Sequence, residues 1–399
     1  MRILYVTTTF PLYSETFIQR EVRALRELGA DLRIVSMHNG EREFEGLAVD
    51  RFSKWELIHV LWRLPWIMIS RWKAFREWWT TLFTERPPSA LSFWENMLGM
   101  GVALLRERSV RELQPDIVHC VWSGGPGAFG WANSLLVGTR FSVGAHAYDV
   151  FDHGGDWLLN SKLDPAVLIH TSTRSAYEEL IKRAPKSKIR LIRRGLNRFP
   201  EMAPLRSDRS RLRIVCVARL VEKKGFPYQV EIYEAMVRAG IDFEARIIGE
   251  GPERERIESD LKERGLAGRV SLSGRLSQPE TMERIAWADA LIHTGIIARN
   301  GDRDGLPNVI PEAMSSGTIV VASPVSGVVE AIEDGVTGLL AEVGDANRWI
   351  GSFRRIQNED ALCESLRAMA REWVEREFSA KRNSGRLLAA LSELSAPAQ

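Results

Sequence analysis

The chain has 399 residues, which is too long for one ordinary hydrophobic core and predicts two domains. Its 45% hydrophobic and 27% charged residues are typical of a folded protein and exclude a largely disordered chain. The formal net charge is only +2, so overall charge gives no case for nucleic-acid binding. The three cysteines lie far apart and match no metal or disulfide spacing, which predicts a reducing, cytoplasmic location.

The first half of the chain alternates short β-branched runs with helical patterns. It opens with ILYVTT at 3–8, which predicts a first strand and not a signal peptide. A helix follows from about Ser14 to Leu28, capped by Ser14 or Thr16. With helices between them, further strands are predicted at 31–37, 116–122, 141–146, 166–172 and 189–195. This alternation predicts a parallel sheet covered by helices on both faces.

A tryptophan-rich helical segment interrupts the alternation at about 50–110. Six of the chain's 13 tryptophans lie between residues 55 and 79, and four basic residues are interleaved with them: Arg63, Arg71, Lys73 and Arg76. The apolar run at 57–70 is short and contains Arg63 and Pro65, so it is not predicted to span a bilayer. Two interpretations stay open for 55–79. The segment either contacts a membrane surface or a lipid-linked acceptor, or packs its tryptophans against the first domain.

A second alternation follows the stretch at 197–211, which has two prolines, many polar residues and no periodicity and therefore predicts a linker. Strands are predicted beyond it at 212–220, 243–251, 269–276, 290–295, 318–323 and 337–343, and the rest of the chain is helical. The predicted fold class is α/β, with two doubly wound domains. Ligands of such sheets bind at the carboxyl ends of the strands, and a cleft between two domains is the default site.

The stretch GDRDGLPNVIPEAMSSG at 301–317 places two acids around a turn and a helix start. The helix is predicted from about Asn308 to Ser316, and Gly317 ends it. Its N-terminus would offer unpaired N–H groups to a phosphate. Asp304 and Glu312 could then bind a ribose diol and a sugar hydroxyl on either side. The alternative is an ordinary helix cap followed by a solvated acid.

Three details of the sequence bear on this interpretation. Pro311 is tolerable only in a first helical turn, so the helix is expected to begin late or to be distorted. The glycine motif GPGAFG at 125–130 has dinucleotide-binding spacing, but no acid ends a following strand at the required distance. Close packing of a helix on the sheet is therefore its predicted role. The DRD at 302–304 has the form of a metal-binding pair, although no metal is expected here.

Residues 304–340 resemble the donor-site signature of family 4 glycosyltransferases, which have the GT-B fold. The chain departs from this signature at Asp304, where the family usually has glutamate, and at Pro311. The resemblance implies two Rossmann-like domains facing a central cleft. An acceptor domain at 1–198 would contain the tryptophan-rich insertion, and a donor domain would occupy 199–375. A C-terminal helix at 376–399 would pack back on the first domain.

The same resemblance implies roles for individual residues. In VARLVEKKGF, Arg219 and Lys224 would hold the donor diphosphate, although such a cluster alone is more often a solvated face. In GAHAYDV, His146 would touch the transferred sugar and Asp149 would support it. The catalytic residues implied are His146, Asp304 and Glu312. The remaining residues implied at the nucleotide and diphosphate are Gly249, Glu250, Arg275, Leu276, Gly305, Leu306, Pro307 and Asn308.

The activity implied is transfer of a sugar from a nucleotide-diphosphate sugar to a glycan or lipid-linked acceptor, with retention and without metal or other cofactor. The expected context is exopolysaccharide biosynthesis in the bacterial cytoplasm, with peripheral contact at the inner face of the membrane through 55–79. Three alternatives remain: a nucleotide-sugar epimerase of the same fold, a non-catalytic assembly subunit, and an oxidoreductase using the Gly125 loop. Arg219, Lys224 and Glu312 argue against the non-catalytic alternative.

Overall fold

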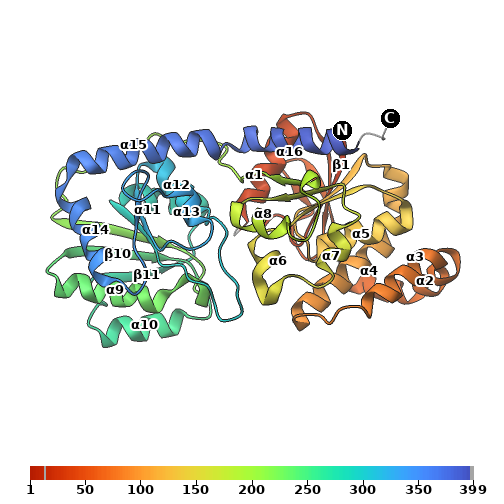
Figure 1. Cartoon of the computed structure of the whole chain (residues 1–399), viewed down its shortest axis with the longest axis horizontal. Helices are drawn as coiled ribbons and strands as arrows, with labels where there is room; N and C mark the ends of the chain where they lie inside the picture. The colour runs from red at the N-terminus through yellow and green to blue at the C-terminus, as the bar shows by residue number, and fades with distance from the viewer. Residues whose placement is uncertain (13–14, 396–399) are drawn as a thin grey trace. The chain divides into compact units, whose positions relative to one another are not determined.

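The computed structural model describes residues 1–12 and 15–395, which contain two β-sheets. Unit 1 comprises Met1–Asn197 together with Ala380–Gln399, and unit 2 comprises Arg198–Ser379. Each unit has its own sheet with its own covering helices (Figure 1). The chain is therefore an α/β protein with two doubly wound halves, as its sequence pattern predicts.

Unit 1 has a sheet of eight strands in the described residues, and its strand order reverses near the middle. The strands are β1 (Arg2–Thr7), β2 (Asp31–Ser36), β3 (Glu43–Phe44), β4 (Leu47–Arg51), β5 (Ile117–Cys120), β6 (Phe141–Gly144), β7 (Leu168–Thr171) and β8 (Ile189–Leu191). Their spatial order is β3-β4-β2-β1-β5-β6-β7-β8, and all neighbours are parallel except β3 and β4. The chain order therefore reverses between β1 and β5.

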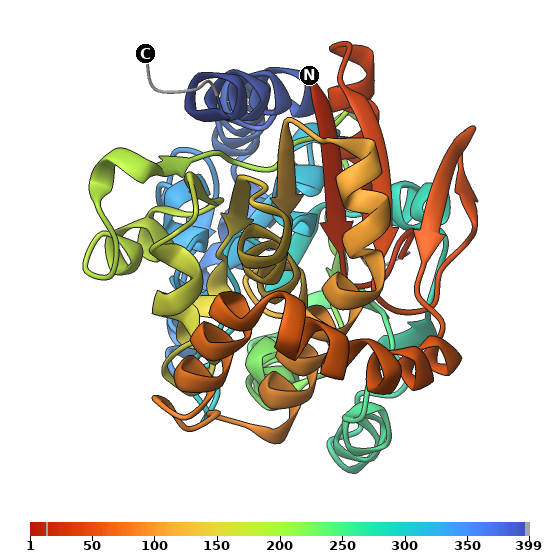
Figure 2. The ribbon, with the colours of Figure 1, turned by 90° about the vertical axis from the view of Figure 1, so that its right-hand side faces the viewer.

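Helices cover both faces of the unit 1 sheet, which is why its strands read as continuous apolar runs. One buried cluster joins the sheet to α4 and α5, and another joins it to α1 and α16. Figure 2 turns this unit toward the viewer. The helices are α1 (Thr16–Glu27), α2 (Leu57–Ser70), α3 (Trp72–Leu82), α4 (Ala90–Leu113), α5 (Gly125–Val137), α6 (Ala147–Phe151), α7 (Leu159–Leu163), α8 (Arg174–Leu180) and α16 (Ala380–Ser395).

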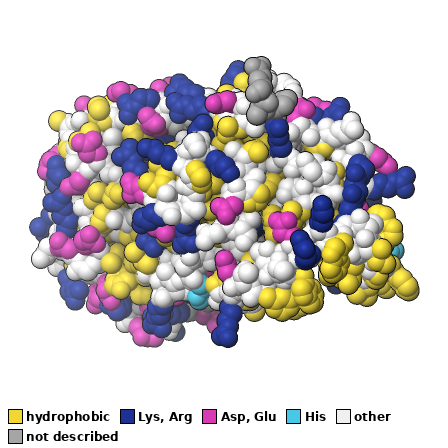
Figure 3. All heavy atoms as spheres, turned by 45° about the vertical axis from the view of Figure 1, so that its right-hand side comes forward, with side chains coloured by type: hydrophobic (Ala, Val, Ile, Leu, Met, Phe, Trp, Pro, Cys, Tyr) yellow, Lys and Arg dark blue, Asp and Glu magenta, His cyan; other side chains and the backbone are white. Residues whose placement is uncertain are grey.

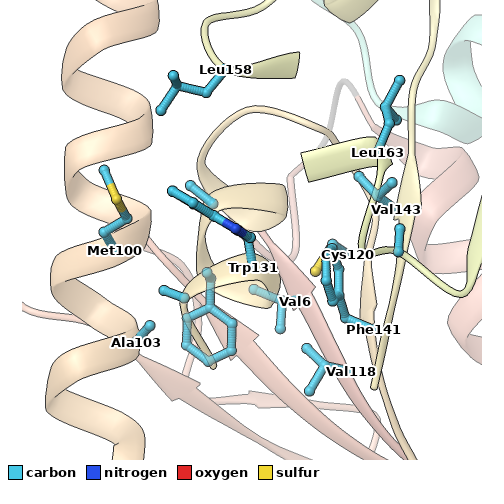
Figure 4. Close-up of a cluster of buried hydrophobic side chains, with 14 of the residues drawn as sticks. Val6, Met100, Ala103, Val118, Cys120, Trp131, Phe141, Val143, Leu158 and Leu163 are labelled. Atoms are coloured by element: carbon cyan, nitrogen blue, oxygen red, sulfur yellow. The ribbon is translucent and has the colours of Figure 1, made fainter. Parts of the chain in front are cut away.

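The core between α4, α5 and the sheet explains the glycine motif at 125–130. Met100 and Ala103 on α4 lie toward Trp131 on α5, which packs above the strands (Figure 4). At Gly130 a Cβ atom would lie 2.5 Å from the Cys120 sulfur and 2.8 Å from the Phe141 ring. Only glycine allows α5 to approach the sheet this closely. The predicted role in helix–sheet packing is thus confirmed at Gly130.

Unit 2 has a six-stranded parallel sheet in the described residues. Its strands are β9 (Arg211–Val217), β10 (Asp242–Ile248), β11 (Val270–Gly274), β12 (Ala290–His293), β13 (Ile319–Ala322) and β14 (Leu339–Leu340). They lie in the order β11-β10-β9-β12-β13-β14. The chain order reverses between β9 and β12, so the loops that follow these two strands diverge. That point of divergence is where open α/β sheets bind their ligands.

Helices also cover both faces of the unit 2 sheet. The main buried cluster takes side chains from α9, α10 and α14 on one face, while α11, α12 and α15 pack together on the other. The helices are α9 (Phe226–Arg238), α10 (Arg254–Glu263), α11 (Gln278–Trp287), α12 (Val309–Ser316), α13 (Val328–Ala331), α14 (Ala346–Asn358) and α15 (Asp360–Glu377).

Every strand predicted from the sequence is present, but one predicted helix cap needs correction and one hairpin was not predicted. The predicted cap at Thr16 is wrong, because Thr16 is the first helical residue and Glu15 occupies the N-cap without a capping side-chain bond. The other predicted cap, Ser14, lies outside the described residues. The hairpin of β3 and β4 was also not predicted, since two residues of strand are too short to show a pattern.

We predict that Gly130→Ala destabilises unit 1 by about 1–3 kcal/mol, because the added methyl group overpacks the contact between α5 and the sheet. Urea unfolding measures this free energy. Gly385→Ala in α16 is the matched control, since its Cβ would meet only Leu28 at 3.8 Å. The control should be neutral or up to about 1 kcal/mol stabilising, as expected for alanine in a helix. Equal effects at both positions would contradict the packing role.

Candidate functional site

The candidate site in unit 2 lies where β9 and β12 end beside each other. The loop after β9 leads through a short 3₁₀ turn at Glu222–Lys224 into α9. The loop after β12 runs from Thr294 to Asn308 and leads into α12. Because both loops leave the carboxyl edge of the sheet at its reversal point, side chains on them can converge on one ligand.

Four charged residues on these two loops form a cluster of two lysines and two aspartates. The Lys224 ammonium donates to Asp304 Oδ2 at 2.5 Å. The Lys223 ammonium lies 2.9 Å from Asp302 Oδ2 and 3.6 Å from Asp304 Oδ1. These side chains are only 10–18% exposed. The lysine–aspartate cluster (Lys223, Lys224, Asp302 and Asp304) therefore ties the two loops together with balanced charge.

His293, the last residue of β12, extends this cluster inward. Its Nε2 atom lies 3.5 Å from Asp304 Oδ2. Burial lowers the pKa of His293, so the ring is neutral at pH 7. Burial alone would raise the pKa of Asp304, but the Lys224 ammonium and the nearby His293 ring outweigh it and hold that pKa well below its ordinary range. Asp304 therefore stays an ionised acceptor at any physiological pH.

Asp302 belongs to an ion pair and not to a group of metal-ligating side chains. Its carboxylate accepts from Lys223 at 3.0 Å. Within residues 1–12 and 15–395, no group of three or more His, Cys, Asp or Glu side chains is arranged to hold a metal ion. In the DRD at 302–304, Asp302 thus pairs with Lys223 and Asp304 pairs with Lys224.

The backbone holds the two loops in contact at a glycine. Gly225 has a φ of +65°, and a Cβ atom there would lie 2.0 Å from the Thr294 carbonyl oxygen. The Thr294 hydroxyl donates to the Lys224 carbonyl at 3.0 Å, and the Ile296 N–H donates to the Lys223 carbonyl at 2.9 Å. Any side chain at position 225 would push the loops apart and separate the charged cluster.

The start of α12 adds backbone donors to the site. The helix begins at Val309, one residue later than predicted, and Asn308 is its N-cap. Pro311 is then the third helical residue, where its missing N–H removes no intrahelical bond. The Glu312 N–H still donates to the Asn308 carbonyl at 3.1 Å. The Asn308 Oδ1 atom is buried without a hydrogen-bond partner among the described residues, and the Asn308 side chain makes no capping bond to the helix.

Glu312 is buried on α12 and is held by a neighbouring helix. Only 5% of the residue is exposed, and its Oε1 atom accepts from Gln278 Nε2 at 3.2 Å. Gln278 is the first residue of α11. Glu312 is therefore not a solvated acid, which argues against the alternative interpretation of this stretch.

The other residues expected at the diphosphate differ in their exposure and partners. Arg219, just beyond β9, is exposed and has no ion pair with any described residue. Gly305 and its successors Leu306 and Pro307 precede α12, with Leu306 and Pro307 buried. The loop before α12 is packed closely, because a Cβ atom at Gly327 would lie 2.7 Å from the Leu306 nitrogen. This packing orients the helix start.

The residues expected at the nucleotide lie at the ends of β10 and β11. The Gly249 N–H donates to the Gly274 carbonyl at 2.8 Å, which joins the two strand ends. Glu250 is exposed and pairs with Arg254 of α10 at 2.9 Å. Arg275 is exposed and Leu276 is half-buried beyond β11. The structure thus puts Lys224 and Asp304 in direct contact, whereas these four residues follow other strands of the sheet.

His146 and Asp149 lie together at the carboxyl end of β6 in unit 1. The His146 N–H donates to Asp149 Oδ2 at 3.0 Å at the start of α6. The His146 ring is buried between Trp122 and His170, with ring centroids 5.1 and 5.4 Å away. Burial lowers the pKa of His146 well below its ordinary value and raises the pKa of Asp149 to about 7. This pair is a neutral imidazole beside a carboxyl that titrates near neutrality.

A row of buried histidines behind His146 was not predicted from the sequence. His119 on β5 stacks on His170 of β7 with centroids 5.0 Å apart. His119 Nδ1 lies 2.8 Å from the Ser142 hydroxyl, and burial lowers the pKa of His170 to about 3. Gly144 on the intervening β6 leaves room for the His170 ring. The available signal was a single histidine in each of two otherwise apolar strands.

Comparison with known proteins gives a family match and two long sequence relatives. The family described as glycosyl transferases group 1 matches residues 197–373. An amylovoran biosynthesis glycosyltransferase of Erwinia amylovora is 27% identical over 402 residues, covering 95% of this chain and 96% of the relative. A protein named as a colanic acid biosynthesis glycosyltransferase in Salmonella typhimurium is 24% identical, with the same coverage of both chains.

Solved structures share the fold along nearly the whole chain. An Anabaena protein crystallised in complex with UDP and glucose has a TM-score of 0.71 at 16% identity and covers 98% of this chain and all of its own. A sucrose-phosphate synthase from Thermosynechococcus elongatus has a TM-score of 0.75 at 17% identity and covers 99% of both chains. At these identities the likeness establishes the fold alone. Residues 197–373 therefore match the group 1 family of glycosyl transferases, and the chain as a whole has the GT-B fold.

Proposed function

We propose that this chain transfers a sugar from a nucleotide-diphosphate sugar to a hydroxyl group of a glycan or lipid-linked acceptor in exopolysaccharide biosynthesis. The observation that carries this proposal is the contact between Lys224 and Asp304 in front of α12. This contact would offer a cation to a diphosphate and an ionised acceptor to a sugar hydroxyl at one point. The names of the two long relatives, which are biosynthetic glycosyltransferases of extracellular polymers, support the context.

Lys224 and the start of α12 would bind the diphosphate. An ammonium and the N–H groups of a helix N-terminus both favour phosphate, and both oppose the charge that grows on the leaving nucleotide. Arg219 is exposed and without an ion pair in the described residues, so it is free to add a bidentate contact. These groups would supply the positive charge that a metal ion supplies in other transferases.

Donor binding would exchange partners within the lysine–aspartate cluster. When a diphosphate takes Lys224, the buried Asp304 carboxylate loses its closest cation and needs another donor. A hydroxyl group of the donor sugar meets that need at the same time. A nucleotide diphosphate without its sugar would leave Asp304 with only Lys223 and His293 nearby. Asp304 would therefore favour binding of the complete nucleotide sugar.

Glu312 would accept the hydroxyl groups of the ribose, and Gln278 would orient it. In unit 1, the neutral His146 ring would contact the transferred sugar, with Asp149 holding the His146 backbone. As the family resemblance implies, the acceptor hydroxyl would attack from the face that the nucleotide leaves, with retention of configuration and without a covalent enzyme intermediate.

The first prediction concerns the donor site. Thermal unfolding with UDP, GDP, ADP and their sugar conjugates should reveal stabilisation by one nucleotide, larger for its sugar conjugate. Lys224→Met should abolish that stabilisation, because the diphosphate loses its ammonium partner. Lys262→Met on the exposed face of α10 is the control and should retain it. If no nucleotide stabilises the wild-type chain, the proposed donor site is wrong.

The second prediction concerns Glu312. Glu312→Gln keeps the side-chain shape but loses the charge, so kcat/KM for sugar transfer should fall by about ten- to a hundred-fold, the value of a hydrogen bond to a charged group. Product analysis with donor and acceptor measures the transfer, and Glu333→Gln on the exposed surface is the control. Product formation without any acceptor would instead favour the epimerase. Full activity of Glu312→Gln would remove Glu312 from the site.

The third prediction concerns Asp149, whose pKa burial raises to about 7. An unfolded aspartate ionises near pH 4, so between about pH 4 and 7 the folded state binds the extra proton. Rising pH therefore lowers the free energy of unfolding by up to about 1.4 kcal/mol per pH unit in that window. Asp149→Asn removes this slope.

Urea unfolding at a series of pH values tests the prediction. The stability of Asp149→Asn relative to wild type should improve from about pH 4 to 7 and level off above. Asp164→Asn, an exposed position in the same unit, should follow the wild-type curve. Parallel curves for Asp149→Asn and wild type would show that Asp149 does not keep its proton in the folded chain.

A further inference from the structure

The exposed apolar side chains of the described residues are concentrated on one part of unit 1. Of the 19 large apolar side chains that are exposed, 13 lie between residues 55 and 94. Figure 3 shows hydrophobic side chains gathered over α2 and α3. We call the exposed apolar side chains of residues 55–94 the aromatic patch. A concentration of this kind on a folded protein marks an interaction surface.

Helix α2 is apolar on two opposite faces. Val60, Leu64 and Ile67 pack into the core of unit 1. On the other side Trp62 and Ile69 are 78% and 84% exposed. A helix on the surface of a water-soluble domain carries polar side chains on its outer face, and one that is apolar all round is buried against something. The apolar outer face of α2 is therefore poorly suited to water and would be stabilised by contact with an apolar partner.

Helix α3 continues the patch with a row of aromatic rings. The centroids of Trp72 and Phe75 are 6.1 Å apart, those of Phe75 and Trp79 are 5.9 Å apart, and those of Trp79 and Phe83 are 5.1 Å apart. Trp78, which points to a different side of the helix, is only 5% exposed. One tryptophan thus anchors α3 in the core, while its neighbours form an exposed aromatic stripe.

The patch is held rigidly on α4. The Arg63 guanidinium donates to the carbonyl oxygens of Leu104 and Leu105 at 2.8 and 3.1 Å. Arg106 of α4 binds Glu56 at 2.6 Å, just before α2. The exposed rings are therefore presented on a fixed support and need not be ordered when a partner binds.

Basic residues surround the exposed rings. The segment 54–86 has six basic and three acidic residues, a net charge of +3, whereas the whole chain has only +2. Lys73 and Arg76 are exposed on α3, between its tryptophans. Tryptophan beside lysine and arginine is the composition of a helix that lies in the interface of an anionic bilayer.

We propose that α2 and α3 dock flat on an anionic membrane surface, with the exposed tryptophans entering the headgroup region. Helix α2 has 14 residues, and none of the helices in residues 1–12 and 15–395 is long and apolar enough to cross a membrane. A second copy of this chain is a poorer occupant, because a symmetric contact would place one net +3 segment against another.

The position of the patch has a consequence for the acceptor, which rests on the proposed function. Helix α4 exposes Trp94 on the patch, while its next residues Glu95 and Asn96 turn inward. Asn96 Nδ2 donates at 3.0 Å to Asp156, in the segment that follows α6. The aromatic patch is thus one helix away from the segment next to α6, which begins after His146 and contains Asp149. An acceptor whose lipid stays in the bilayer would reach α6 from this side.

Vesicle co-sedimentation of the full chain tests the proposal, using phosphatidylcholine vesicles with and without phosphatidylglycerol. Wild type should bind the anionic vesicles, and binding should fall as salt rises. Replacing Trp62, Trp66 and Ile69 together by glutamine should weaken partition by about tenfold or more. The triple variant Ile181→Gln, Val237→Gln and Met369→Gln, at exposed apolar positions elsewhere, is the matched control and should bind like wild type.

Charge variants and a fold control complete the test. Lys73→Gln and Arg76→Gln should each weaken binding to anionic vesicles by about fivefold. Thermal unfolding should give every variant a wild-type melting temperature and nucleotide response, so that loss of vesicle binding is separable from failure of the donor site. Unchanged binding of the Trp62, Trp66 and Ile69 variant would overturn the proposal. So would a wild-type dimer that this variant converts to monomer without any vesicle binding.

Discussion

The largely buried ion pair between Lys224 and Asp304 is the interaction on which the candidate site in unit 2 depends. It joins the loops after β9 and β12 at the reversal point of the sheet, and Gly225 lets the two backbones meet there. Neither charge could remain buried alone, because removing a partner leaves an uncompensated ion in a poorly hydrated place. The charges of the candidate site are therefore balanced within the protein itself. Under the proposed function, a ligand would have to offer substitutes for both partners, and the pair would be selective as well as structural.

The fold could be predicted largely from the sequence because buried parallel strands read as apolar runs separated by helical patterns. The candidate residues Asp304 and Glu312 were proposed for a different reason, since their motif combines a turn, a helix start and charges in one short stretch, whereas Lys224 came from the family resemblance of a separate segment. The sequence could not predict which residues from distant parts of the chain come into contact. Lys224 and Asp304 are 80 positions apart, and their contact depends on strand order. His293 was overlooked because a lone histidine in an apolar strand gives no sign of what it faces.

The tryptophan-rich segment shows how a structure can separate two interpretations that a sequence leaves open. Packing and exposure both occur within it, but for different residues. Trp78 is buried against unit 1, whereas Trp62 and Trp66 lie on the outside of α2. Sequence spacing could not make this division, because α2 is apolar on both faces and lacks the polar stripe that usually identifies the solvent side. The orientation of α2 is set by its contacts with α4, which lie beyond the reach of a local pattern.

The last helix gives the molecule an unusual order of assembly. Residues 380–395 form α16, which packs on α1 and contributes Leu387 and Leu391 to the core beneath it. The N-terminal unit thus includes residues made after the whole of unit 2. During synthesis, the apolar face of α1 must wait for a helix that leaves the ribosome after the whole of unit 2, although N-terminal domains usually fold first. A chain stopped before position 380 would carry a complete unit 2, whereas the core of unit 1 beneath α1 would lack Leu387 and Leu391.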